Sequence, residues 1–185
     1  MKQRSIGLIS VVLGMMILAP SAIAGTLVEF EGGIGVITAD GIFACTPATG
    51  STNCTVNRNV VRGVSPGGQP WVIRRFEAKV KENGDIRAEG KGLVLAGSDN
   101  IGTRGGVTMV AATLFCGSDV PHSTGGHPLA ADGDFKIKDT LSPTPPDPCT
   151  SPVLLIRNFA SPTPGTPPSP GAWFAAGILK LEHDD

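Results

Sequence analysis

The chain has 185 residues and a formal net charge of −1, with 25 glycines, 16 prolines, four cysteines and no tyrosine. Its basic residues form no block and no basic-aromatic stripe, which argues against nucleic acid as a partner. The length suffices for one domain with a hydrophobic core, and the many glycines and prolines predict frequent turns.

Residues 1–24 have the pattern of a secretory signal peptide. A basic start, MKQR, precedes an apolar run from Ile6 to Ala19, and SAIA at residues 21–24 offers a cleavage site. The apolar run of about 14 residues is shorter than the roughly 20 that a spanning helix needs. No second long apolar run follows. We therefore expect export to the periplasm or the cell exterior, and a soluble single domain over residues 25–185 without a transmembrane segment.

Period-two runs recur after residue 24, whereas no stretch keeps a helical period for three turns. The predicted strands, in chain order, are Thr26–Thr38 with a break near Gly32, Asn59–Val64, the two arms of a hairpin within residues 71–94, Val107–Cys116, Asp134–Leu141, Pro152–Asn158 and Ala172–Leu181. The segment Val107–Cys116 is apolar on both parities, which indicates a central strand covered on both sides. Ala172–Leu181 also suits a short helix by composition, but Gly177 favours a strand. These strands predict an all-β fold, a single antiparallel β-sandwich or barrel.

The predicted hairpin has the clearest pattern. A three-residue loop, Glu82-Asn83-Gly84 with Gly84 at positive φ, places Val80 opposite Ile86 and keeps the apolar residues on one face. A two-residue loop would instead place Val80 opposite Arg87. The same parity continues through Gly90 and Gly92 to Val94. We therefore predict that the core contains Phe76, Val80, Val94, Leu114 and Leu154.

The segment RGVSPGGQPW, residues 62–71, predicts a structural turn. Pro66 presets φ for a turn, Gly67 and Gly68 can take positive φ, and Pro70 suits the start of a strand. Trp71 would then cover one end of the core. A glycine loop that grips a ligand is the alternative, but it lacks the following helix and the lysine of a phosphate loop.

All four cysteines follow residue 24, and an even number in an exported chain predicts two disulfides. Of the three pairings we favour Cys45–Cys54, across a short loop of turn formers, and Cys116–Cys149, across a long proline-rich loop. A zinc site of four thiolates is the rival, but no C-x2-C pair is present. The proline-rich segments 142–149 and 161–171 are predicted as stiff spacers, with recruitment of a polyproline-binding partner as the alternative.

A metal-binding loop is one functional hypothesis. His122 and His127 lie in a glycine-rich segment and Asp132 follows, and two imidazoles with a carboxylate can hold a metal. A loop gives such residues no fixed geometry, so solvated histidines are the alternative. The following Asp132-Gly133-Asp134 indicates a turn, since the further ligands of an EF-hand are missing. No other cofactor is expected.

No catalytic set is recognisable. The chain has no G-x-S-x-G elbow, and Ser123 beside His122 does not form a triad. Glu77 and Glu89 fall opposite each other in the hairpin, but the basic residues around them indicate a solvated, salt-bridged face. We therefore expect a non-enzymatic β-domain that binds an unknown protein or envelope partner, or that has a structural role in the envelope. Metal binding through His122, His127 and Asp132 is the alternative, and a small hydrolase without an identifiable nucleophile comes third.

Two motifs, NVVRGVSPGGQPW at residues 59–71 and CTSPVLLIRN…GAWFAAGI at residues 149–178, resemble a family of small exported bacterial proteins of unassigned function. The resemblance covers Asn59 to Leu181, which is most of the chain after residue 24. It implies export but no activity, so no catalytic residue is carried over. The Cys45/Cys54 pair lies outside the resembling segments.

Overall fold

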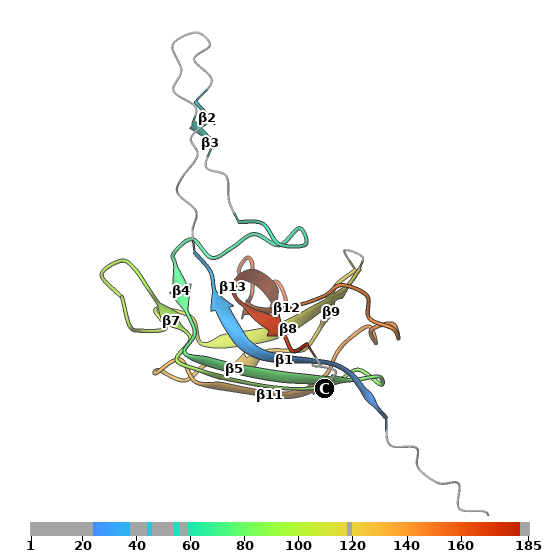
Figure 1. Cartoon of the computed structure of the whole chain (residues 1–185). Coiled ribbons are helices and arrows are strands. Elements are labelled where there is room, and N and C mark those ends of the chain that lie inside the picture. The colour runs from blue at the N-terminus through green and yellow to red at the C-terminus, as the bar shows by residue number, and fades with distance from the viewer. Residues whose placement is uncertain (1–23, 38–43, 46–53, 56–58, 118–119, 182–185) are drawn as a thin grey trace, which may run out of the picture.

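The computed structural model describes residues 24–37, 44–45, 54–55, 59–117 and 120–181. Residues 1–23 of the predicted signal peptide lie outside this part of the chain. The described residues form strands and no helix (Figure 1). Accordingly, they contain no helix that is long and apolar enough to cross a membrane.

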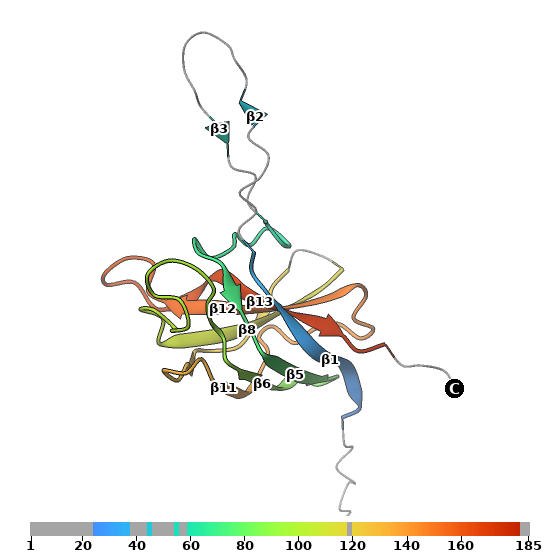
Figure 2. The same ribbon diagram turned by 60° about the vertical axis from the view of Figure 1, so that its left-hand side comes forward.

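Nine strands form one antiparallel sheet with the order β10-β8-β12-β13-β1-β5-β6-β11, and β9 also pairs with β8. Their bounds are β1 (Thr26–Gly35), β5 (Arg75–Lys81), β6 (Asp85–Lys91), β8 (Met109–Cys116), β9 (His122–Ser123), β10 (His127–Pro128), β11 (Phe135–Thr140), β12 (Pro152–Ala160) and β13 (Ser169–Leu179). Two small sheets pair β2 (Ala44–Cys45) with β3 (Cys54–Thr55) and β4 (Trp71–Val72) with β7 (Val94–Leu95). Figures 1 and 2 show β5, β6 and β11 as one wall and β8, β12 and β13 as the opposite wall, with β1 between them.

The two ends of the large sheet meet along residues 122–129, which we call the seam. The seam pairs with β8 through β9 and β10. On its other side Ser123 exchanges two backbone hydrogen bonds of 2.9 Å with Ser142, and Leu129 bridges to Phe135. Between these points the carboxylate of Asp139 accepts a hydrogen bond from the Gly125 N–H, at 3.1 Å. The sheet is therefore a nearly closed barrel, which decides between the two predicted architectures.

Phenylalanine rings fill the barrel interior, and glycines in neighbouring strands make room for them. Phe30, Phe76 and Phe135 are each at most 4% exposed. A Cβ atom on Gly90 would overlap the ring of Phe135, and one on Gly177 would lie 3.0 Å from both the Phe30 and the Phe76 rings. These glycines are thus required by packing, because any side chain would displace an aromatic ring.

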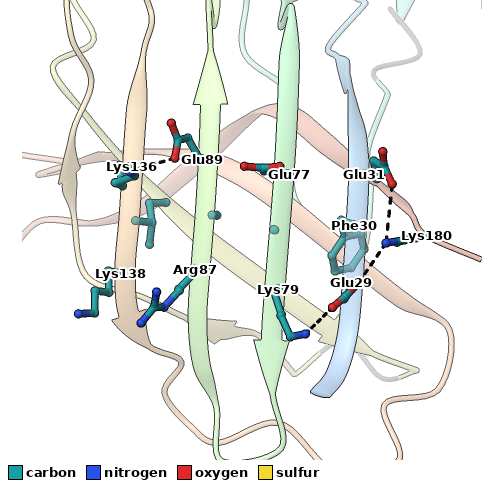
Figure 3. A pocket seen from close by; sticks show the side chains of 13 residues that line it. Glu29, Phe30, Glu31, Glu77, Lys79, Arg87, Glu89, Lys136, Lys138 and Lys180 are labelled. Carbon is teal, nitrogen blue, oxygen red and sulfur yellow. Dashed lines mark hydrogen bonds and ion pairs between the residues drawn. The ribbon is translucent and has the colours of Figure 1, made fainter. Parts of the chain in front are cut away.

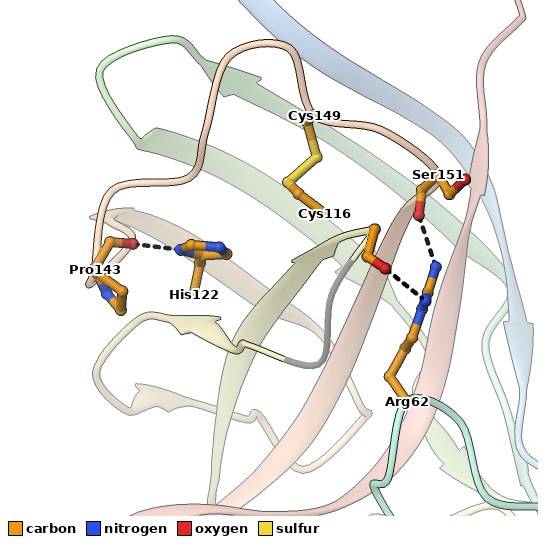
Figure 4. The surroundings of a disulfide bond; sticks show 7 residues. Arg62, Cys116, His122, Pro143, Cys149 and Ser151 are labelled. Carbon is orange, nitrogen blue, oxygen red and sulfur yellow. Dashed lines mark hydrogen bonds between the residues drawn. A yellow bond between two sulfur atoms is a disulfide. The ribbon is translucent and has the colours of Figure 1, made fainter.

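The chain segment 59–67, which we call the strap, lies against β13 and reaches the ends of β8 and β12. Trp173 Nε1 donates a hydrogen bond to the Asn59 carbonyl at 3.1 Å, and Val61 and Val64 pack against the core. The guanidinium of Arg62 donates to the carbonyl of Ser151 at 3.0 Å, just before β12 (Figure 4). The prediction that Val107–Cys116 is covered on both sides is confirmed for β8, because seven of its eight residues are buried.

The predicted turn of Pro66, Gly67, Gly68, Pro70 and Trp71 leads from the strap into β4. Pro66 and Gly67 are buried, and Gly67 N donates to the Trp173 carbonyl. A Cβ on Gly67 would lie 3.0 Å from the ring of Phe174, which stacks on Trp71 at a centroid distance of 4.2 Å. Glycine is needed at this position for close approach.

The expectation of positive φ at Gly67 and Gly68 is wrong. The positive values lie earlier, at Arg62 (φ 49°) and Gly63 (φ 74°). These two residues form a two-residue turn between Val61 and Val64, whose backbones pair with each other. The strand predicted over Asn59–Val64 is therefore absent, because the chain reverses within it.

The hairpin prediction is confirmed. Val80 pairs with Ile86 and Ala78 with Ala88, and Gly84 has a φ of 86°. The prediction that Val94 belongs to the core is wrong. Val94 is only half-buried, whereas its neighbours Leu93 and Leu95 are buried. The parity shifts at Gly92, whose φ of 64° ends β6 and turns the chain toward β7.

The remaining strand predictions hold with shifted ends. β13 begins at Ser169, so the last three residues of the predicted proline-rich loop 161–171 belong to a strand. The Cys116–Cys149 disulfide is present, with a Cα–Cα distance of 4.8 Å. Cys45 and Cys54 stand opposite each other where β2 pairs with β3. Their side chains are outside the described part of the structure, so that disulfide stays a prediction.

Candidate functional site

The outer face of β1, β5, β6 and β11 carries a groove with a volume of about 610 Å³, which we call the charged groove (Figure 3). Burial alternates along β5 and β6: inward residues such as Val80 and Ile86 are buried, and the residues beside them are exposed or half-buried. Alternation of this kind directs every second side chain to the outer face of the sheet. The charged residues around the groove are Glu29, Glu31, Glu77, Lys79, Arg87, Glu89, Lys136, Lys138 and Lys180.

The strand register sorts these charges into two rows. Glu31 pairs across the strands with Glu77, and Glu77 with Glu89. We call these three glutamates the acidic row. Two residues further along the strands, Lys79 pairs with Arg87, and Arg87 with Lys138. We call these three residues the basic row.

Ion pairs hold the margins of both rows. Lys79 Nζ lies 2.6 Å from Glu29 Oε1, and Lys136 Nζ lies 3.1 Å from Glu89 Oε2. These contacts are the main reason why the pKa values of Glu29 and Glu89 lie below the ordinary glutamate value. Both carboxylates are therefore ionised at neutral pH.

The middle residue of each row, and Lys138 at the β11 end of the basic row, have no such partner within the described chain. Among the residues that the structure describes, Glu77, Arg87 and Lys138 form no ion pair and no hydrogen bond through their side chains (Figure 3). Glu77 stands between two other glutamates, and Arg87 stands between two lysines. Like charges directly opposite each other in a sheet are destabilising. Each row thus contains at least one charged side chain without an ion-pair partner in the described chain, next to charges of the same sign.

The residues predicted for a metal do not come together. His122 and His127 stand opposite Leu114 and Val110, four residues apart on β8, which separates their backbones by roughly 13 Å at the usual rise of a strand. His122 is buried, with Nδ1 2.8 Å from the Pro143 carbonyl (Figure 4). No group of three histidine, cysteine, aspartate or glutamate residues able to hold a metal occurs in the described part of the chain.

The other two residues of that hypothesis also have local partners. His127 Nε2 lies 3.1 Å from Asp139 Oδ2. Asp132 Oδ1 accepts a hydrogen bond from the Asp134 N–H at 3.1 Å, within a turn in which Gly133 has a φ of 82°. Pairing with β8 extends the segment from His122 to His127, so the two imidazoles meet different neighbours.

The sequence pattern found only the central part of the charged groove. It placed Glu77 opposite Glu89 among basic residues, and the register confirms that pair. It did not bring Glu29 and Glu31 from β1, or Lys136 and Lys138 from β11, to the same face. Their alternation in EFE and KIK was visible, but the order of the strands was not.

Comparisons with protein-family models, curated proteins and solved structures find no match to this chain. The resemblance carried by the motifs around Trp71 and Trp173 therefore stays a prediction. The functional argument depends on the barrel and on the chemistry of its charged face.

Proposed function

We propose that this chain is an exported, non-enzymatic binding domain whose basic row holds a negatively charged ligand. The observation that carries the proposal is the row itself: Lys79, Arg87 and Lys138 stand side by side on three hydrogen-bonded strands, and two of them have no partner within the described chain. An anion placed over the row would relieve the repulsion among the cations, so its binding is favoured over water at the same place.

The basic row is suited to binding because the sheet fixes its spacing. Adjacent strands lie about 4.8 Å apart, so the three cations span roughly 10 Å before any ligand arrives. A rigid scaffold reduces the ordering cost of association. Arg87, in the centre, can donate two parallel hydrogen bonds to an oxyanion, which lysine cannot do.

The acidic row makes the face selective. Glu31, Glu77 and Glu89 lie one outward-facing position away from the basic row, a distance of about 7 Å along each strand. A ligand that carries negative charge is repelled from this half of the groove and is directed to the other half. Repulsive elements of this kind restrict the orientation in which a partner can bind.

Binding of dextran sulfate, a polyanion, tests the proposal. The protein is taken from its own secretory route, and affinity is measured by titration calorimetry at low and at physiological salt. The Arg87→Gln/Lys138→Gln variant should bind at least about tenfold more weakly, because it loses two charge-assisted contacts. The matched control is Lys136→Gln/Lys180→Gln, which removes the same charge from cations that already have carboxylate partners.

The control should change the affinity by less than about twofold, the scale of a small change in net charge. Equal weakening in both double variants would show bulk electrostatics rather than a site. Absence of binding by the unaltered protein at low salt would also contradict the proposal.

A further inference from the structure

A second, smaller hollow adjoins the basic row on the side away from the acidic row. Its volume is about 280 Å³, and the residues that line it are Lys79, Lys81, Asp85, Ile86, Arg87, Lys138, Asp139 and Thr140. All three residues of the basic row border both hollows. The smaller hollow therefore adds one further cation, Lys81, to the three that the charged groove already offers.

Three of the four cations at this hollow form no ion pair within the described chain. Lys79 Nζ forms an ion pair with Glu29 Oε1 at 2.6 Å. Lys81, Arg87 and Lys138 make no ion pair and no side-chain hydrogen bond with any residue in the described ranges. They come from β5, β6 and β11, three strands that are neighbours in the sheet.

The two carboxylates at the hollow, those of Asp85 and Asp139, accept hydrogen bonds from other groups. Asp85 accepts hydrogen bonds from Asn83 Nδ2 and from the Thr140 hydroxyl, both at 3.0 Å. Asp139 accepts from the backbone N–H groups of Thr140 and Gly125, and it also contacts His127 at the seam. Neither carboxylate comes within ion-pair distance of a cation of the hollow. The hydrogen bonds from Asn83 and Thr140 lower the pKa of Asp85 most, and the charges of Lys81 and Arg87 add to the effect. The hollow still has more cations than carboxylates, so it carries net positive charge for a ligand.

We propose that this hollow seats one tetrahedral oxyanion, a phosphate or sulfate ester group of the ligand that lies on the basic row. The inference rests on the proposed function and narrows its ligand to this chemistry. An esterified phosphate or sulfate presents three free oxygens, and three donor side chains border the hollow from three strands. A carboxylate presents its two oxygens in a single plane, so it matches donors from three strands less well than three tetrahedrally arranged oxygens do.

Lys81 provides the decisive variant, because it borders the smaller hollow and not the charged groove. Lys136 is its matched control, since it borders only the charged groove. The probes are inorganic phosphate and inorganic sulfate, each titrated alone and as a competitor of dextran sulfate. Both ions should bind to the unaltered protein and displace dextran sulfate.

The Lys81→Gln variant should weaken the affinity for the inorganic ions at least about fivefold, the effect expected for loss of one charge-assisted contact, and Lys136→Gln should leave it unchanged. The ion that competes at the lower concentration identifies the ester. Thermal unfolding of both variants should match the unaltered protein, which excludes misfolding as the cause.

Two results separate this inference from the proposed function. If dextran sulfate binds to the basic row but neither ion competes and Lys81→Gln has no effect, the inferred oxyanion site in the smaller hollow is wrong and the proposed function stands. If dextran sulfate itself does not bind, both proposals are overturned.

Discussion

Replacing Cys116 and Cys149 together with alanine should lower the free energy of unfolding by about 3.7 kcal/mol at 25 °C. The disulfide joins residues 33 positions apart, and the loop-entropy relation gives this magnitude for a closed loop of that length. The enclosed segment contains β9, β10 and β11, together with the whole seam. Loss of the disulfide should therefore loosen the closure of the barrel in particular.

The measurement is equilibrium unfolding in guanidinium chloride, followed by the fluorescence of Trp71 and Trp173. These are the only tryptophans of the chain, and both are at most 4% exposed. Hydrogen exchange gives the local readout: the N–H groups of Ser123 and Ser142, which pair across the seam, should lose more protection than that of Val80.

The comparison variant is Cys45→Ala/Cys54→Ala, which removes the predicted disulfide across a much shorter loop. It should cost less stability and should leave hydrogen exchange at the seam unchanged. A loss below about 1 kcal/mol in the Cys116/Cys149 double variant would refute the loop-closure reasoning. Unchanged protection of the seam in that variant would refute the link between the disulfide and barrel closure.

Three further predictions follow from the packing and the charges. Gly90→Ala should lower the free energy of unfolding by about 1–3 kcal/mol in the same assay. Adding Phe135→Leu to the Gly90→Ala variant should restore part of this loss, because the smaller side chain makes room for the new methyl group. Glu77→Gln should instead raise stability by about 0.2–1 kcal/mol because it relieves repulsion within the acidic row, whereas Glu89→Gln, which removes an ion pair, should not. Burial raises the pKa of Asp139, but hydrogen bonds to its carboxylate outweigh burial and hold the pKa below the ordinary value. Its stabilising effect is therefore present above about pH 4 and is lost as the pH falls below that value, so the unfolding midpoint of Asp139→Asn should depend less on pH between roughly 5 and 2.

Local patterns gave the elements of this fold because their causes are local. The alternation around Glu82-Asn83-Gly84 selected the turn and its register, since a two-residue loop would place Arg87 opposite Val80, on the core face. The apolar parities of Val107–Cys116 showed a strand covered on both sides. The same reasoning failed at Gly92, where a single positive φ reversed the parity and left Val94 half-buried.

The candidate site could be predicted only in part. Glu77 and Glu89 come from one hairpin, so their pairing was visible in the sequence. Lys138 is 51 residues from Arg87, and nothing in either segment states that β11 lies beside β6. The placement of the residues in the metal hypothesis was hidden for the same reason, because pairing with β8 decided the neighbours of His122 and His127.

The sequence by itself determined the all-β class, the hairpin register and the alternation of charged and buried residues in the hairpin, and among three possible cysteine pairings it favoured the Cys116–Cys149 disulfide that the structure contains. The first three features depend on periodicity and turn chemistry, and the preference among the pairings depends on the loops that the cysteines enclose. Only the tertiary structure decided that the sheet closes along residues 122–129 and that its order places two rows of like charges side by side. Strand order depends on contacts between residues far apart in the chain, and a short period along the sequence does not specify them.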